Sequence, residues 1–160
     1  MSTYASKAFL RTAAVVAAVL VCGAWTKVDS KPIDASIYAI TTVCIEENTE
    51  VKITDLTSLI HEGFERHGIA TEIYDKLPDS CDFYAKYTAT RRWDFVAFLS
   101  DARIAVYHRG KLIGFAERVG TRGVFGGGGA SPDKWASTKS KIDPLMDRLL
   151  EGFPKQGVSN

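Results

Sequence analysis

The chain has 160 residues and carries 20 lysine and arginine side chains against 19 aspartate and glutamate side chains. Because the two charges nearly cancel, no overall field favours nucleic acid or an anionic membrane, and no nucleic-acid partner is predicted. About 135 residues would remain after removal of an export segment, which is one domain's worth and enough to bury a core.

The N-terminus has the layout of a bacterial export signal. Two basic residues precede an apolar run from Thr12 to Val21, and Cys22 follows the run at once. This order of charge, apolar run and thiol is typical of lipoprotein precursors. The run has about ten residues, roughly half the length that a bilayer-spanning helix needs. It predicts a signal peptide over residues 1–21 and a lipid on Cys22.

A second cleavage site stays open beside the first. Val21 is bulkier than the small residue that usually precedes a lipidated cysteine. A general signal peptidase could instead cut after Ala24, so that the signal spans residues 1–24. Lipidation predicts an outer-membrane anchor with the domain facing the periplasm, since Gly23 is not the acidic residue that retains lipoproteins in the inner membrane. Cleavage after Ala24 predicts a soluble periplasmic or secreted protein.

The cysteine count fits an exported protein, because export permits disulfide bonds. Once Cys22 is set aside as the lipid site, Cys44 and Cys81 are the one pair that remains. A disulfide between them would stabilise the fold by about 3–4 kcal/mol in the chain-entropy model. Two independent thiols are the alternative. The two cysteines lack the spacing of a structural zinc site, and neither a metal nor a cofactor is predicted.

The first two predicted elements are a strand and a helix. The strand runs from Ile37 to Ile45 and is rich in β-branched residues. The helix has Thr54 or Asp55 as its N-cap and Gly68 as its C-terminal cap. Its apolar residues fall at helical spacing on one face, namely Leu56, Leu59, Ile60 and Phe64.

Strand patterns fill the middle of the chain. Thr71–Tyr74 is a short strand, and Phe83 to Arg92 alternates between apolar and polar side chains, which is typical of a half-buried antiparallel strand. The same alternation returns after Asp101, where Ala102, Ile104 and Val106 are the apolar residues. Arg109-Gly110 then predicts a tight hairpin into a last strand over Leu112–Val119.

A glycine-rich stretch from Gly120 to Gly129 leads to the last helix. Ser131-Pro132-Asp133 predicts the start of this helix, because it combines a cap, a proline in the first turn and an early acidic residue. Pro144 is expected to kink the helix or to start a new one. Three side chains are expected to face inward, namely Trp135, Thr138 and Ile142.

Together these elements predict an α+β fold in the order β-α-β-β-β-β-α. Its sheet is mostly antiparallel, with the two main helices packed on one face. The single domain spans residues 37–153 and follows a polar tether over residues 22–36. Residues 154–160 are expected to form a frayed tail.

Three patterns suggest catalysis, and each has a structural explanation. His61 and His67 lie six residues apart, about 240° around a helix, so they cannot share one metal ion. Ser131 to Lys134 matches the nucleophile motif of penicillin-interacting enzymes, but the partner motifs are missing and Ser131 can serve as an N-cap. Gly126–Gly129 could cradle an anion, but it lacks P-loop spacing. No catalytic residue is predicted.

The segment from Arg91 to Phe95 is the densest mixture of charged and aromatic side chains. It predicts a binding surface formed by Arg91, Arg92, Trp93 and Asp94, with Lys134 as a further cation. The alternative is structural: Asp94 caps the chain or pairs with an arginine where the chain leaves the strand, while Trp93 and Phe95 pack.

Several motifs in this order resemble a family of small, largely uncharacterised proteobacterial envelope lipoproteins. The resemblance implies a lipid-anchored periplasmic domain and carries over no catalytic residue. The element order is also similar to that of small periplasmic lipoprotein domains used in curli secretion or cell-wall synthase activation. The motifs are Val43-Cys44-Ile45-Glu46-Glu47-Asn48, Gly63 to Ile69, Cys81, Tyr87-Thr88-Ala89 with Trp93-Asp94, and Lys134-Trp135 through Thr138-Lys139 to Lys141-Ile142-Asp143-Pro144.

These observations predict a non-enzymatic envelope lipoprotein domain, a binding or assembly module with a membrane contact through its lipid and a possible envelope protein partner. One alternative is a small periplasmic hydrolase or metal-dependent enzyme, which would bring His61 or His108 together with Asp94, Asp101 or Glu117. Another is a soluble secreted factor whose mature form lacks Cys22.

Overall fold

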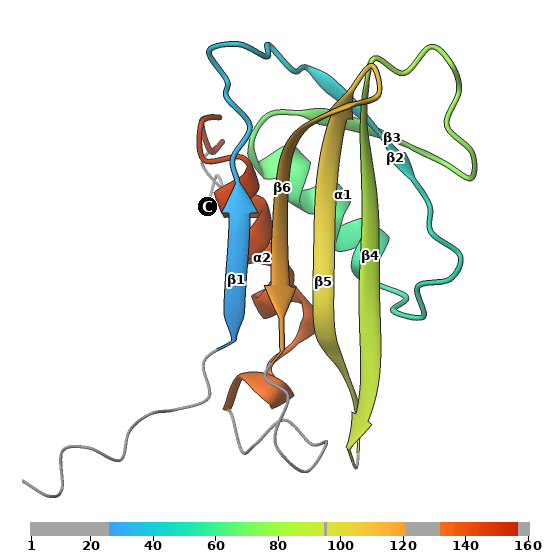
Figure 1. The fold of residues 1–160 in the computed structure, drawn as a ribbon, viewed down its shortest axis with the longest axis vertical. Helices are drawn as coiled ribbons and strands as arrows, with labels where there is room; N and C mark the ends of the chain where they lie inside the picture. Colours follow the sequence, from blue (N-terminus) through green and yellow to red (C-terminus); the bar gives the residue numbers. More distant parts are fainter. Residues whose placement is uncertain (1–25, 95, 121–131, 157–160) are drawn as a thin grey trace, which may run out of the picture.

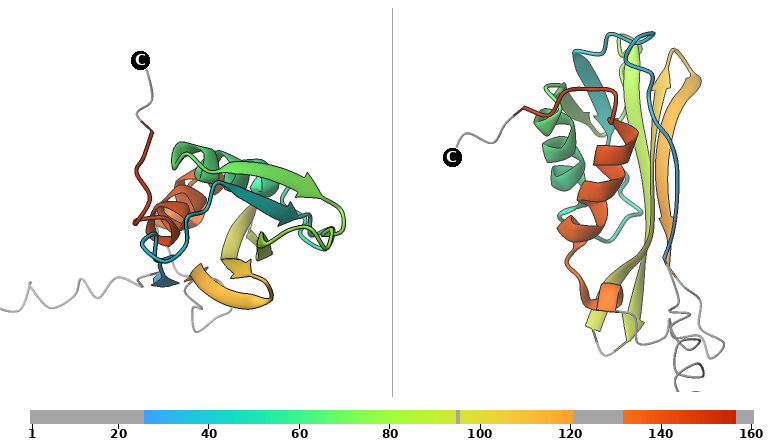
Figure 2. Two further views of the ribbon diagram at one scale, coloured as in Figure 1. Left: turned by 90° about the horizontal axis from the view of Figure 1, so that it is seen from above. Right: turned by 90° about the vertical axis from the view of Figure 1, so that its left-hand side faces the viewer.

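The computed structural model describes residues 26–94, 96–120 and 132–156. Within these ranges the chain forms one six-stranded sheet with two α-helices on one face (Figures 1 and 2). This is the predicted α+β, single-domain architecture, preceded by one additional strand. The elements in chain order are β1 (Lys27–Lys31), β2 (Thr42–Glu46), α1 (Leu56–Arg66), β3 (Ala70–Tyr74), β4 (Phe83–Asp94), β5 (Val96–His108), β6 (Lys111–Val119), the 3₁₀ helix η2 (Pro132–Trp135) and α2 (Thr138–Leu149).

The sheet has the strand order β1-β6-β5-β4-β2-β3 and combines two halves of different direction. β1, β6, β5 and β4 are antiparallel neighbours, whereas β4, β2 and β3 run parallel. α1 connects β2 to β3, because parallel neighbours need a long crossover. β2 and β4 share only the pairs Cys44–Tyr84 and Ile45–Ala85, so the two halves meet over a short junction.

Alternation along β4 separates a buried face from an open face, as the sequence predicts. Ala85 and Tyr87 are buried under the helices, whereas Lys86 and Thr88 are exposed. The helices and the sheet enclose the core between them (Figure 2). The large side chains that are fully buried there include Phe64, Ile104, Ile142, Leu145 and Leu149.

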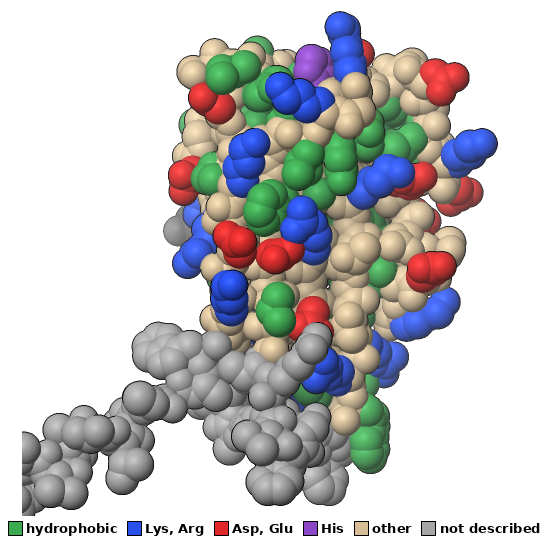
Figure 3. Space-filling view, viewed as in Figure 1, with side chains coloured by type: hydrophobic (Ala, Val, Ile, Leu, Met, Phe, Trp, Pro, Cys, Tyr) green, Lys and Arg blue, Asp and Glu red, His purple; other side chains and the backbone are tan. Residues whose placement is uncertain are grey.

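The open face of the sheet carries a mixture of basic, acidic and apolar side chains (Figure 3). Two ion pairs on this face join neighbouring strands. Lys86 binds Glu46 at 2.5 Å, and Arg103 forms an ion pair with Glu117. Such a face is typical of an antiparallel sheet with one side in water.

α1 forms where the sequence predicts it. Asp55 occupies the N-cap position, and Gly68 follows the helix with a φ of +70°. Glycine adopts this left-handed conformation without steric cost, which makes it a good helix terminator. The predicted apolar face, consisting of Leu56, Leu59, Ile60 and Phe64, is entirely buried.

α2 begins later than predicted, and the structure corrects three expectations here. Pro132–Trp135 form only a 3₁₀ turn, and the extended backbone of Ser137 separates this turn from α2. The Ser137 hydroxyl caps α2 by accepting from the Ser140 N–H at 3.2 Å. Trp135 is 51% exposed instead of facing inward. Pro144 lies inside α2 and therefore starts no new helix.

The N-terminal boundary of the domain also differs from the prediction. The tether expected over residues 22–36 contains β1, which pairs with β6 from Lys27–Val119 to Lys31–Phe115. β1 lies at the edge of the sheet and has one face in water, so charged side chains alternate along it while Val28 packs against the core. The sequence does not predict this strand, because four of its five residues are polar.

The strand expected over Ile37–Ile45 is shorter in the structure. The Asp34 carboxylate accepts hydrogen bonds from the N–H and the hydroxyl of Ser36, which fixes a turn before β2. As a result Ile37 is 67% exposed, and β2 starts only at Thr42.

The residues after α2 are packed rather than frayed up to residue 156. The Gln156 N–H donates to the Arg66 carbonyl at 2.7 Å, and the Lys155 amine donates to the Asp147 carboxylate at 2.9 Å. The predicted tail over residues 154–160 is therefore wrong for its first part, and residues 157–160 lie outside the described ranges.

His67, which follows α1, is only 3% exposed. Its ring lies 3.0 Å from the Phe153 carbonyl and 3.3 Å from the Asp147 carboxylate. Burial alone would raise the pKa of Asp147, but hydrogen bonds from Lys155 and His67 outweigh burial and hold the pKa below its ordinary value of 3.8.

Asp147 gives a prediction about acid stability. A carboxyl group with a lowered pKa stabilises the folded state fully above 3.8, and this contribution is lost as the pH falls below that value. We expect Asp147→Asn to lower the free energy of unfolding at neutral pH and to weaken its further decrease in acid. Urea unfolding over a pH series measures both effects. Asp79→Asn, in an exposed loop, is the matched control; equal acid sensitivity in Asp147→Asn and the wild type would contradict the assignment.

Gly63 gives a second prediction, because α1 and α2 approach closely there. A Cβ at Gly63 would lie 2.5 Å from Cγ of the buried Met146. Gly63→Ala gains up to about 1 kcal/mol of helix propensity, but overpacking in a core typically costs about 1–3 kcal/mol. We expect a net loss of stability in urea unfolding, whereas Ser58→Ala, at an exposed position of α1, should be neutral or slightly stabilising. A stabilised Gly63→Ala variant would show that the helices separate easily.

Candidate functional site

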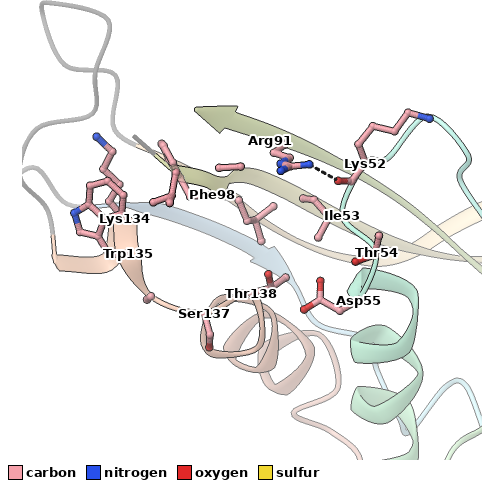
Figure 4. A pocket seen from close by; sticks show the side chains of 14 residues that line it. Lys52, Ile53, Thr54, Asp55, Arg91, Phe98, Lys134, Trp135, Ser137 and Thr138 are labelled. Carbon is pink, nitrogen blue, oxygen red and sulfur yellow. Dashed lines mark hydrogen bonds between the residues drawn. The ribbon is translucent and has the colours of Figure 1, made fainter. Parts of the chain in front are cut away.

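A groove of about 400 Å³ opens where the first turns of α1 and α2 meet the ends of β4 and β5 (Figure 4). The segment before α1 contributes Lys52 and Asp55, β4 contributes Arg91, and β5 contributes Phe98. Thr138 lines the groove from the start of α2. Three segments that are distant in the sequence therefore build one concave surface.

Both helices point their N-terminal ends at this groove. α1 begins at Leu56 after Asp55, and α2 begins at Thr138 after Ser137. The two helices pack against each other, so their first turns lie side by side (Figure 4). The N-terminus of a helix carries a partial positive charge, which favours negative groups in this position.

Basic side chains predominate among the charged groups of the groove. These are Lys52, Arg91 and Lys134, and Asp55 is the acidic one. The Arg91 guanidinium donates to the Lys52 carbonyl at 3.5 Å. The Lys134 amine lies 5.3 Å from the ring centre of Phe98 and 5.2 Å from that of Trp135, within the range of cation–π attraction.

Large apolar side chains stand exposed beside the groove. Trp93 is 75% exposed, Val96 55% and Trp135 51%. We call these three residues, together with Lys52, Arg91 and Lys134, the hairpin-end surface, because they surround the end of the β4–β5 hairpin. Exposed apolar side chains that gather at one place mark interaction sites on folded proteins.

The structure separates the residues of the predicted binding surface. Arg91 and Lys134 both line the groove. Arg92 follows Arg91 in the alternating strand and lies 3.9 Å from Asp101, outside the groove. Trp93 is 75% exposed, so the alternative in which it packs against the protein is wrong for this residue. The Asp94 side chain, Phe95 and Cys22 lie outside what the structure describes, as do Gly126–Gly129 and Ser131.

Sequence reasoning missed Lys52, Val96, Phe98 and Trp135 as members of this surface. Lys52 and Phe98 have no signal in the sequence, because only the fold brings their segments together. Trp135 is predicted to face inward from a continuous helix, but the 3₁₀ turn over Pro132–Trp135 leaves it exposed.

Lys141 belongs to α2 and is only 3% exposed. Its amine donates to the Leu99 carbonyl at 3.1 Å and to the Lys134 carbonyl at 3.0 Å. A buried ammonium group needs such hydrogen bonds. Lys141 therefore joins α2, β5 and η2 beneath the groove and holds Lys134 in position.

The histidines considered for catalysis lie apart. His61 bonds to Thr71 and lies 3.9 Å from Glu65. His108 stacks on Phe83 with ring centres 4.4 Å apart and is seven residues, or about 23 Å of strand, from Asp101. Among the described residues no three His, Cys, Asp or Glu side chains gather in a way that could hold a metal ion.

The predicted disulfide between Cys44 and Cys81 is confirmed. Cys44 lies on β2 within the short junction to β4, and Cys81 precedes β4 by two residues. The bond therefore ties the two halves of the sheet together at the point where few backbone pairs connect them.

None of the described helices is long and apolar enough to cross a membrane. No known protein family and no curated protein matches the sequence.

Solved structures show a likeness of fold. The chain resembles PelC from Paraburkholderia phytofirmans, a dodecamer, with a TM-score of 0.55 and 11% identity over 82% of this chain and 100% of that chain. A variant PelC dodecamer from the same organism gives a TM-score of 0.51 and 9% identity over 83% and 100%. A minor lipoprotein from Acinetobacter baumannii is a weak neighbour, with a TM-score of 0.30 and 12% identity over 72% and 86%.

The position of the disulfide predicts its energetic role. The two cysteines are separated by 37 residues in the sequence, and closing a loop of this length restricts the unfolded chain by about 3–4 kcal/mol. We expect a Cys44→Ala and Cys81→Ala double variant to lose about this free energy of unfolding in urea. Reduction of the wild type should give a similar loss and leave the variant unchanged. Identical unfolding midpoints in reduced and oxidised wild type would contradict this role.

Proposed function

We propose that the protein is a lipid-anchored envelope domain that binds or assembles with other molecules and catalyses no reaction. The lipid is attached to Cys22, and the domain faces the periplasm from the outer membrane. The observation that carries the proposal is the hairpin-end surface, where Trp93, Val96 and Trp135 are exposed beside basic side chains. A surface of this kind suits binding, because contact with a partner removes apolar area from water.

The N-terminal sequence supports the anchor. A basic N-terminus, a short apolar run and Cys22 follow one another as in lipoprotein precursors. β1 begins at Lys27, five residues after Cys22, so a lipid at Cys22 would hold the folded domain close to the bilayer.

The fold supports assembly as one form of this function. PelC, which has a similar fold, forms a dodecamer. In the described part of the chain β1 and β3 are the edge strands of the sheet, and an edge strand can pair with a strand of another copy. Light scattering of the purified protein after size-exclusion chromatography measures its mass. A mass of several copies supports assembly, and a monomer restricts the proposal to binding.

Mass spectrometry of the mature N-terminus tests the proposal. The full chain is expressed with its own signal, and the protein is purified from native membranes. We expect residues 1–21 to be absent and Cys22 to carry a diacylglyceryl mass. Cys22→Ser should lack this mass and lose its membrane anchor.

Two results would contradict the proposal. A mature protein that begins at Trp25 would show simple secretion. Turnover of a substrate that is lost on changing Ser131 or His61 would show that the domain is an enzyme.

A further inference from the structure

We infer that the hairpin-end surface contacts the bilayer that carries the lipid anchor. Its tryptophan and valine side chains enter the headgroup region, and its basic side chains bind anionic phospholipid headgroups. The inference rests on the proposed anchor at Cys22 and names the partner of this surface.

Strand register places the surface at the end of the domain where the chain enters. Lys27, the first residue of β1, pairs with Val119 of β6. On the other side of β6, Arg118 pairs with Ala102 of β5, so Lys27 lies level with Asp101 of β5. From this level β4 continues by four residues, from Thr90 to Asp94, which is about 13 Å of strand. β1 runs away from this end (Figure 1). The anchored N-terminus and the hairpin end therefore lie on the same side.

The length of chain before β1 limits where the anchor can reach. Five peptide steps from Cys22 to Lys27 span at most about 18 Å. This covers the distance of about 13 Å along the strands to the level of the hairpin end. The other end of β5, at His108, lies seven residues beyond Asp101 in the opposite direction, or about 23 Å. A lipid on Cys22 thus brings the hairpin end to the bilayer and holds the other end away from it.

The exposed side chains have the chemistry of a membrane interface. Tryptophan is enriched where hydrocarbon meets headgroups, because its ring is apolar and its N–H is polar. Trp93 and Trp135 are 75% and 51% exposed, and Val96, which is 55% exposed, stands beside the end of the same hairpin. A bilayer surface would cover all three at once.

The basic side chains fit anionic headgroups. Lys52 and Arg91 are exposed, and each donates to a backbone carbonyl rather than to a carboxylate. Lys134 adds a third positive charge beside Trp135. On the open face of the sheet, by contrast, Lys86 and Arg103 are paired with acidic residues. Among the described side chains that line the groove, three are basic and Asp55 is the acidic one.

Depth-dependent quenching of tryptophan fluorescence tests the inference. The chain has three tryptophans. Trp25→Phe and Trp135→Phe together leave Trp93 as the only emitter in the mature full chain. This lipidated protein is reconstituted into vesicles of phosphatidylcholine brominated on its acyl chains, with or without phosphatidylglycerol. Mass spectrometry of the same sample reports the lipid on Cys22.

The matched control places the only tryptophan at the other end of the domain. It replaces all three tryptophans by phenylalanine and adds Ile37→Trp, because Ile37 is 67% exposed in the turn between β1 and β2. We expect bromine to quench Trp93 and to leave the control unquenched. Equal quenching at the two positions, or none at either, in a protein with lipidated Cys22 would overturn the inference. A second protein or another copy on this surface would also leave Trp93 unquenched.

Charge reversal tests the headgroup contact. Each basic residue near an anionic surface contributes about a fivefold change in partitioning, so Lys52→Glu with Arg91→Glu should strongly reduce quenching of Trp93 in vesicles with phosphatidylglycerol. Lys76→Glu with Lys111→Glu makes the same change in net charge at exposed positions outside the hairpin-end surface and should have no such effect. Quenching that is equal with and without phosphatidylglycerol would overturn the anionic part. Absence of the lipid on Cys22 would instead refute the proposed anchor.

Discussion

The junction between β2 and β4 is the constraint on which the rest of the structure depends. The two strands share two residue pairs, and these join the parallel half of the sheet to the antiparallel half. The Cys44–Cys81 disulfide reinforces the junction at one end. At its other end Asn48 donates to the Tyr87 hydroxyl at 3.1 Å and to the Tyr87 carbonyl at 3.0 Å. Tyr87 also bonds to Thr57 in the first turn of α1 at 2.6 Å. The start of α1 is thereby fixed on β4.

The groove follows from this arrangement. Lys52 and Asp55 lie in the segment that leads from the junction into α1, and Arg91 follows Tyr87 along β4 on the same face. The opposite wall depends on Lys141, whose buried amine binds carbonyls of both Leu99 and Lys134. One wall is therefore held by a short parallel junction and the other by a buried cation, and neither wall belongs to a single continuous element.

The sequence predicts the elements that have a strong period. The two-residue alternation of β4 and the apolar face of α1 are correct because burial of one face imposes those spacings. β1 is not predicted from the sequence, because an edge strand with one face in water needs few apolar residues. The burial of Lys141 could not be predicted, because lysine is seldom buried and the two carbonyls that accept from its amine become its neighbours only through the tertiary fold.

The candidate site was predictable only where it lies in one stretch of sequence. Arg91 and Trp93 stand in a dense run of charged and aromatic residues, but alternation in a strand sends Arg92 to the other face. Lys52 and Trp135 come from segments about forty residues away on either side, so no local pattern links them to Arg91.

The proposed lipid anchor and the proposed bilayer contact together predict how the domain is oriented at the membrane. With the hairpin end at the bilayer, β4 and β5 stand away from the membrane, and the open face of the sheet and the Arg109–Gly110 turn remain accessible from the periplasm. An envelope partner would then meet paired charges such as Arg103 and Glu117 rather than the exposed tryptophans. Anchoring and partner binding would thus use different surfaces, so charge reversal at Lys52 and Arg91 should disturb membrane contact without changing an assembly through the sheet edges.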